Sequence, residues 1–85
     1  MNYELIFSRQ AAKFIQKLSD DDKNRFREVF EKLSENPYSF PYKKIRGKER
    51  MYRIRVGKYR VLYQISGKTI IVIKINTREK AYKNI

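Results

Sequence analysis

The sequence of 85 residues contains neither cysteine nor histidine. Without cysteine there are no disulfides and no zinc–thiolate sites, and a reducing, cytoplasmic setting is expected. Without histidine the chain lacks both the usual metal ligand and the usual general base. Its nine Asp and Glu residues lie mostly in helical stretches, without the spacing of a ligand cluster. The sequence therefore predicts no catalytic metal and no cofactor.

Long apolar segments are also missing. The longest aliphatic run, Ile70–Ile73, is far too short to cross a membrane. The first seven residues lack the basic start and the apolar run of a signal peptide. We expect residues 1–85 to form a single domain with a small core.

Negative charge is scarce in the second half of the chain. Residues 1–42 carry seven Lys or Arg and seven Asp or Glu, whereas residues 43–85 carry fourteen Lys or Arg and only two acidic residues. The whole net charge of +12 therefore comes from residues 43–85. Charge segregated in this way favours a polyanion, RNA or DNA, as the partner of one face.

The first half of the chain predicts a strand and a helical hairpin. Alternation over residues 2–7 indicates a short strand. Two amphipathic helices follow, with Ser8 and Ser19 as their N-caps. Apolar residues recur in each at i, i+3, i+4 and i+7 and are expected to face the core: Ala11, Phe14, Ile15 and Leu18, then Phe26, Val29, Phe30 and Leu33. The second helix ends at Asn36-Pro37, and an irregular stretch is expected after it.

From Met51 onward the hydrophobic period changes to two. This pattern predicts three strands, joined by a two-residue turn at 57–58 and a three-residue turn at 66–68. The expected fold class is α+β. An N-terminal strand and a two-helix hairpin precede a mainly antiparallel sheet of three further strands, with the helices on one face.

Arginines occupy the side of these strands that faces away from the expected core. With a turn at 57–58, Arg55 lies directly opposite Arg60, and Arg53 lies opposite Leu62. Like charges paired across strands are destabilising. A cationic cluster formed at such a cost is expected where a phosphate binds.

A three-residue turn at 66–68 would also bring Lys74 opposite Arg60. The alternative interpretation is that the charges only protect a solvent face from aggregation. That interpretation suits Lys58, Lys68 and Lys74 better than arginines in the middle of two neighbouring strands.

Four segments resemble toxins of the RelE type in the RelE/ParE superfamily. They are Lys44-Ile45-Arg46-Gly47, Tyr52-Arg53-Ile54-Arg55, Gly57-Lys58-Tyr59-Arg60-Val61-Leu62-Tyr63 and Arg78-Glu79-Lys80-Ala81-Tyr82. The similarity covers nearly the whole chain. It implies a small toxin that cuts messenger RNA in the ribosomal A site and is held inactive by a cognate, RelB-like antitoxin. It also implies that the protein has no membrane partner and no small-molecule cofactor.

The resemblance also implies which residues are catalytic: Arg53, Arg55, Arg60, Arg78 and Tyr82. Arginine binds phosphate bidentately and stays charged, so it suits stabilisation of the phosphoryl group while the neighbouring 2′-OH attacks. The tyrosine would stack on a base or accept a proton. Candidate contacts to ribosomal RNA, expected in a basic loop and on one further strand, are Lys43, Lys44, Arg46, Lys48, Arg50 and Lys74. The alternative interpretation of the basic loop is that it is a solvated, flexible loop that does not contact RNA.

Two other functions stay open at this point. One is a toxin similar to ParE, which inhibits DNA gyrase without cutting nucleic acid. The other is a non-catalytic RNA-binding module, which would be expected to carry stacking aromatic residues on its charged face. The predicted strands place most tyrosines on the opposite face.

Overall fold

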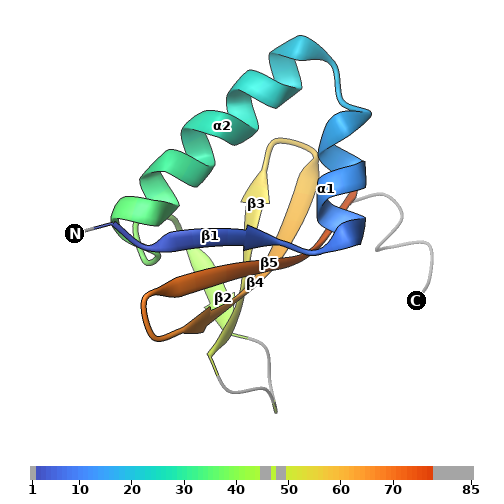
Figure 1. Ribbon diagram of the computed structural model, residues 1–85. Helices are drawn as coiled ribbons and strands as arrows, with labels where there is room; N and C mark the ends of the chain where they lie inside the picture. The colour runs from blue at the N-terminus through green and yellow to red at the C-terminus, as the bar shows by residue number, and fades with distance from the viewer. Residues whose placement is uncertain (1, 45–46, 48–49, 78–85) are drawn as a thin grey trace.

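The computed structural model describes residues 2–44, 47 and 50–77, which form a five-stranded sheet with two helices against one face (Figure 1). The elements are β1 (Glu4–Phe7), α1 (Arg9–Gln16), α2 (Asp20–Glu35), β2 (Tyr42–Lys44), β3 (Met51–Val56), β4 (Tyr59–Ser66) and β5 (Thr69–Thr77). The strand order is β1-β5-β4-β3-β2, with β1 parallel to β5 and the other neighbours antiparallel. The predicted α+β class is confirmed.

Both helices begin at the serines that the sequence predicts as caps. The Ser8 Oγ accepts a hydrogen bond from the Ala11 N–H at 3.1 Å, and the Ser19 Oγ accepts one from the Asp22 N–H at 3.2 Å. Three aspartates occupy the first turn of α2, where the helix dipole stabilises negative charge. In the described part of the chain, neither helix is long and apolar enough to cross a membrane.

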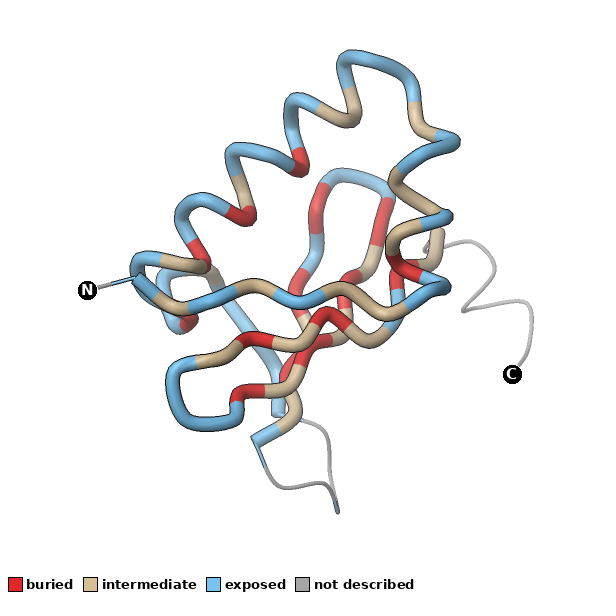
Figure 2. The backbone as a smooth tube through the Cα atoms, viewed as in Figure 1, coloured by how far each residue is buried: buried red, intermediate tan, exposed pale blue. Residues whose placement is uncertain are grey.

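The core lies between the sheet and the helices, and its buried segments are red in Figure 2. The helices contribute Ala11 from α1 and Phe26, Phe30 and Leu33 from α2. The strands contribute Tyr52, Ile54, Val56, Tyr59, Val61, Tyr63, Ile65, Ile70, Val72 and Ile75. The remaining members of both predicted apolar stripes pack against this core as partly buried residues. The prediction that the stripes are structural is confirmed.

The β3–β4 hairpin has the predicted register. Gly57 takes a φ of +59° in the two-residue turn, a left-handed conformation that glycine adopts without a steric penalty. Ile54 pairs with Val61, and Val56 pairs with Tyr59. Because side chains alternate along a strand, the arginines between these buried residues lie on the open side of the sheet.

The β4–β5 hairpin differs from the prediction in its turn. Ser66 pairs with Thr69, so only Gly67 and Lys68 form the turn, rather than three residues. Gly67 has a φ of +59°, which suits a tight two-residue connection.

The same hairpin contains a β-bulge. Ile73 is an extra residue in β5, because the register shifts by one beside Leu62, whose partner is Lys74. The Ile73 carbonyl oxygen accepts a hydrogen bond from the Ser8 hydroxyl at 2.5 Å. The prediction that Lys74 lies opposite Arg60 is wrong, because the shorter turn and the bulge together displace it.

The structure contains a strand, β2, where the sequence predicts an irregular segment. Lys43 of β2 lies opposite Arg53, and Lys44 lies opposite Tyr52. All three residues of β2 are exposed, so the strand has no alternation of buried and exposed side chains to reveal it. The expected loop placement of Lys43 and Lys44 is therefore wrong.

Strand β5 extends past the end of β1, and the side chain of Gln10 covers the edge of this extension. Strand β1 ends at Phe7, but the Gln10 Nε2 donates to the Ile75 carbonyl oxygen at 2.9 Å. The Gln10 Oε1 in turn accepts from the Ile75 N–H at 3.0 Å. The side-chain amide of Gln10 thus takes the place of a peptide group in a neighbouring strand.

Candidate functional site

The face of the sheet turned away from the helices carries the predicted arginine cluster. Arg55 lies directly opposite Arg60, and Arg53 lies opposite Leu62, as the sequence predicts. On its other side, toward β2, Arg53 lies opposite Lys43 in the strand register. We call Arg53, Arg55 and Arg60 the arginine face; two strands hold them together, and β2 adds a further cation beside them.

The three arginine residues differ in exposure. Arg55 is exposed, whereas Arg53 and Arg60 are half-buried. The Nε atom of Arg60 is buried. Arg60 is therefore positioned by its surroundings, while Arg55 presents its charge directly to solvent.

A hollow of about 530 Å³ lies beside the arginine face at the β2 edge of the sheet. It is lined by Pro41, Tyr42, Lys43, Arg53, Ile54 and Arg55. This volume is in the range of small-ligand sites, and the planar forks of two arginines suit a phosphate. Within the described ranges, no three acidic side chains form a group that could hold a metal ion.

Strand β5 borders the arginine face beyond Arg60. Asn76 lies opposite Arg60 and is half-buried, and its amide can both donate and accept hydrogen bonds. Lys74 is exposed and lies opposite Leu62, diagonal to Arg60. Asn76 is absent from the predicted site because its position depends on the bulge, which no residue pattern in the sequence indicates.

The structure separates the other predicted site residues. Lys44 lies on the opposite side of β2 from Lys43, because successive residues of a strand alternate. Arg50 is exposed directly before β3 and has a φ of +56°. The remaining predicted residues lie outside the described part of the chain: Arg46, Lys48, Arg78 and Tyr82.

The tyrosines of β3 and β4 lie on the core side, as predicted. The Tyr59 hydroxyl donates to the Asp22 Oδ2 at 2.8 Å, and the Tyr63 hydroxyl donates to the Pro37 carbonyl oxygen at 2.7 Å. Burial raises the pKa of both hydroxyls, and the neighbouring Asp22 carboxylate raises the pKa of Tyr59 further. Both therefore keep their protons at neutral pH and hold the fold together.

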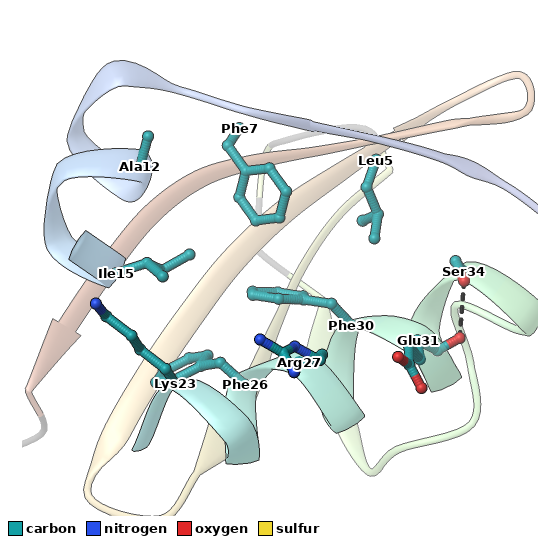
Figure 3. A pocket seen from close by; sticks show the side chains of 10 residues that line it. All are labelled: Leu5, Phe7, Ala12, Ile15, Lys23, Phe26, Arg27, Phe30, Glu31 and Ser34. Carbon is teal, nitrogen blue, oxygen red and sulfur yellow. Dashed lines mark hydrogen bonds between the residues drawn. The ribbon is translucent and has the colours of Figure 1, made fainter. Parts of the chain in front are cut away.

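A second hollow, of about 520 Å³, lies on the helix-covered side between β1 and the two helices (Figure 3). Its walls are mainly apolar and include Leu5, Phe7, Ala12, Ile15, Phe26 and Phe30. Its polar residues all come from α2: Lys23, Arg27, Glu31 and Ser34. Walls of this kind suit apolar side chains of a partner rather than a phosphate. The hydrophobic pattern of the sequence does not predict this opening.

Comparison with known proteins places the chain among small toxins. Residues 5–82 match the family described as the ParE toxin of the type II toxin–antitoxin system parDE. The chain is 34% identical to RelE1 of Methanocaldococcus jannaschii across 99% of both chains.

Solved structures agree with this relationship. RelE in the archaeal RelE–RelB complex of Pyrococcus horikoshii OT3 superimposes with a TM-score of 0.81 and 30% identity, over 92% of this chain and 97% of that one. The isolated RelE toxin of Escherichia coli gives a TM-score of 0.75 and 26% identity, over 96% of this chain and 97% of that one. The protein therefore belongs to the RelE/ParE superfamily of type II toxin–antitoxin toxins and is of the RelE type.

Proposed function

We propose that this toxin is an endoribonuclease that cleaves messenger RNA in the A site of the ribosome. The observation that supports this proposal best is the assembly of Arg53, Arg55 and Arg60 on one open face of the sheet. Fixed guanidinium groups stabilise the charge that develops on a phosphoryl group in its transition state.

In the proposed reaction the 2′-oxygen of the nucleotide before the cleaved bond attacks the phosphorus. The bond from phosphorus to the 5′-oxygen of the next nucleotide breaks. The 2′-OH gives up its proton, and the departing 5′-oxygen receives one, so the products are a 2′,3′-cyclic phosphate and a 5′-OH. This scheme needs no metal ion and no cofactor.

Each arginine has a role in this scheme. Arg60, held by its surroundings, and Arg55, opposite it, stabilise the non-bridging oxygens of the phosphoryl group. Arg53, beside the hollow at β2, holds the substrate backbone. Arg78 and Tyr82 are included in this scheme only because the resemblance to RelE toxins implies them. Arg78 is proposed as a further clamp, and Tyr82 as the group that stacks on a base or accepts the 2′-OH proton.

The ribosome is proposed to supply what the protein lacks. Arginine transfers protons poorly, and the core tyrosines hold theirs. Correct placement of the reacting groups alone can contribute several powers of ten in rate. We therefore propose that the toxin acts in the cytoplasm and that contacts to ribosomal RNA position it on the ribosome. The residues proposed for these contacts are Lys43, Lys44, Arg46, Lys48, Arg50 and Lys74.

We propose a RelB-like antitoxin as the inhibitory partner. The similar toxin of Pyrococcus horikoshii was solved with RelB. The net charge of +12 favours an acidic partner here. Such a partner would block RNA by covering the arginine face, and the apolar hollow beside β1 offers room for its non-polar side chains.

Inhibition of DNA gyrase is the second candidate function, because the matching family is described by its ParE member. Primer extension on a messenger that is being translated separates the candidates. Ribosome-dependent cuts at A-site codons support the proposal. Uncut messenger together with blocked gyrase supercoiling would favour the second candidate, and RNA binding without either effect would favour a non-catalytic module.

A further inference from the structure

Two exposed tyrosine rings lie in contact at the β2 edge of the sheet, on the side opposite the arginine face. Tyr38 is 47% exposed and Tyr42 is 38% exposed. Among the described residues, only Ile6 is another large hydrophobic side chain with comparable exposure. The two ring centroids are 5.6 Å apart with an interplanar angle of 56°. We call this pair the tyrosine platform.

The tyrosine platform rests on buried aromatic rings. Tyr52, which is nearly buried, meets both platform rings edge-on, at 5.7 Å from Tyr38 and 5.2 Å from Tyr42. Beneath it, Tyr63 lies 5.8 Å from Tyr52 and donates its hydroxyl hydrogen bond to the backbone of Pro37. The exposed rings therefore sit on a fixed base.

The backbone on either side of the tyrosine platform is also constrained. The Tyr38 N–H donates to the Asn36 Oδ1 at 3.0 Å, in a turn that closes the end of α2. Tyr42 is held by pairing with Ile54 of β3. Ordered rings bind a flat ligand with a smaller entropic cost than mobile ones do.

Two cations, Lys44 and Arg50, lie near the tyrosine platform. Lys44 lies two residues beyond Tyr42 in β2, on the same face, and directly opposite Tyr52. A side-chain hydrogen bond with Tyr52 and burial raise the pKa of the Tyr38 hydroxyl, while the charges of Arg50 and Lys44 act on it in the opposite direction. Among the described residues, the two charged side chains that act on this hydroxyl are thus positive.

We propose that the tyrosine platform binds a base of single-stranded RNA, with Lys44 and Arg50 contacting the adjacent phosphates. Stacking on aromatic rings beside a basic track is how proteins hold single strands without reading their sequence. The apolar hollow beside β1 lies elsewhere, on α1, α2 and β1, and it suits a partner protein better than these exposed rings do.

The position of β2 explains how one RNA strand can reach both sites. Lys43 lies on the arginine face, while Tyr42 and Lys44 lie on the other side of the same edge strand. Tyr42 also lines the hollow that contains Arg53 and Arg55. A strand leaving that hollow around the β2 edge meets the tyrosine platform next. This inference rests on the proposed function only in taking RNA as the partner.

Binding of a non-cleavable RNA tests the inference separately from cleavage. The probe is a fluorescent, single-stranded 2′-O-methyl oligonucleotide of mixed sequence, and the isolated protein is titrated into it. We expect the double variant Tyr38→Ala/Tyr42→Ala to bind about tenfold more weakly. The variant Tyr38→Phe/Tyr42→Phe should bind within about twofold of the wild type, because it keeps the rings. Ile6→Ala is the matched control, because Ile6 is an exposed apolar residue of β1, at the opposite edge of the sheet from β2. This variant should bind the oligonucleotide like the wild type.

Equal affinity of the alanine and phenylalanine variants for the oligonucleotide would overturn the inference. So would a loss of antitoxin binding with RNA binding intact, because the surface would then belong to the antitoxin. If the wild-type protein binds no oligonucleotide, the inference fails even where ribosome-dependent cleavage is observed.

Crosslinking gives a second readout that does not depend on folding of the variants. An oligonucleotide containing 4-thiouridine is irradiated with the wild-type protein, which is then digested with trypsin. The peptide from Leu33 to Lys43 contains both platform tyrosines. We expect it to carry the crosslinked nucleotide. Crosslinks confined to other peptides would contradict the proposed site.

Discussion

Arg55 and Arg60 lie directly opposite each other in the β3–β4 hairpin, one residue pair from the turn, on the face turned away from α1 and α2. Two like charges in this arrangement repel, at a cost of roughly 0.2–1 kcal/mol. We propose that this repulsion is offset when the pair binds a phosphate.

Arg55→Ala is expected to lower ribosome-dependent cleavage about 100-fold, since it removes a charge that stabilises the transition state. Its melting temperature should be equal to that of the wild type or slightly higher, because Arg55 is exposed and its repulsion with Arg60 is relieved. Lys58→Ala, which removes an exposed cation from the adjacent turn, is the control and should cleave normally. A large loss of melting temperature in Arg55→Ala would indicate a structural role instead.

Gln10→Ala is expected to destabilise the fold by about 1 kcal/mol, because it removes both hydrogen bonds to the Ile75 backbone. For a domain of this size the melting temperature should fall by roughly 4–8 °C. Gln16→Ala is the control, since Gln16 is exposed near the end of the same helix. Thermal unfolding followed by circular dichroism measures both variants. Equal melting temperatures would show that the Gln10 side chain does not support the edge of β5.

Stability should fall at alkaline pH because the Tyr63 hydroxyl is buried and its pKa is raised in the folded state. Such a group stabilises the fold fully below its unfolded pKa of about 10, and this contribution is lost as the pH rises above that value. Each pH unit in that window costs about 1.4 kcal/mol. Tyr38 and Tyr59 have pKa values raised in the same direction.

Tyr63→Phe isolates this effect from the titration of lysines. The variant loses the hydrogen bond to Pro37 and should melt below the wild type at pH 8. Above about pH 10 the difference in melting temperature should narrow. The wild type then loses the stability that comes from the raised pKa of Tyr63, whereas phenylalanine does not titrate. Melting curves between these pH values give the comparison. A difference that stays constant with pH would mean that Tyr63 ionises in the folded state as freely as in the unfolded one.

Local patterns in the sequence were sufficient to predict the helices and the central hairpin. Ser8 and Ser19 are strong caps, and the strict alternation on both sides of Gly57 determines which residues of β3 and β4 face each other. The arginine face follows directly from that register.

The features missed by the sequence analysis depend on non-local contacts. Strand β2 has three exposed residues and is a strand only because β3 supplies its hydrogen bonds. The bulge at Ile73 is stabilised by Ser8, which is 65 residues away in the chain. The position of Lys74, the place of Asn76 opposite Arg60 and the tyrosine platform all depend on these two features.

The most direct test of the proposed mechanism replaces a single oxygen of the substrate. A messenger with one 2′-deoxy nucleotide immediately before the cleaved phosphate is translated to the point where that codon occupies the A site, and the toxin is added. If the 2′-oxygen is the nucleophile and the arginine face stabilises its attack, cleavage at that bond disappears while the toxin still binds the ribosome. The unmodified messenger, cut in parallel, should yield a 2′,3′-cyclic phosphate and a 5′-OH. Cleavage of the deoxy substrate that leaves a 3′-OH end would show that water attacks instead, and it would contradict the mechanism proposed for Arg53, Arg55 and Arg60.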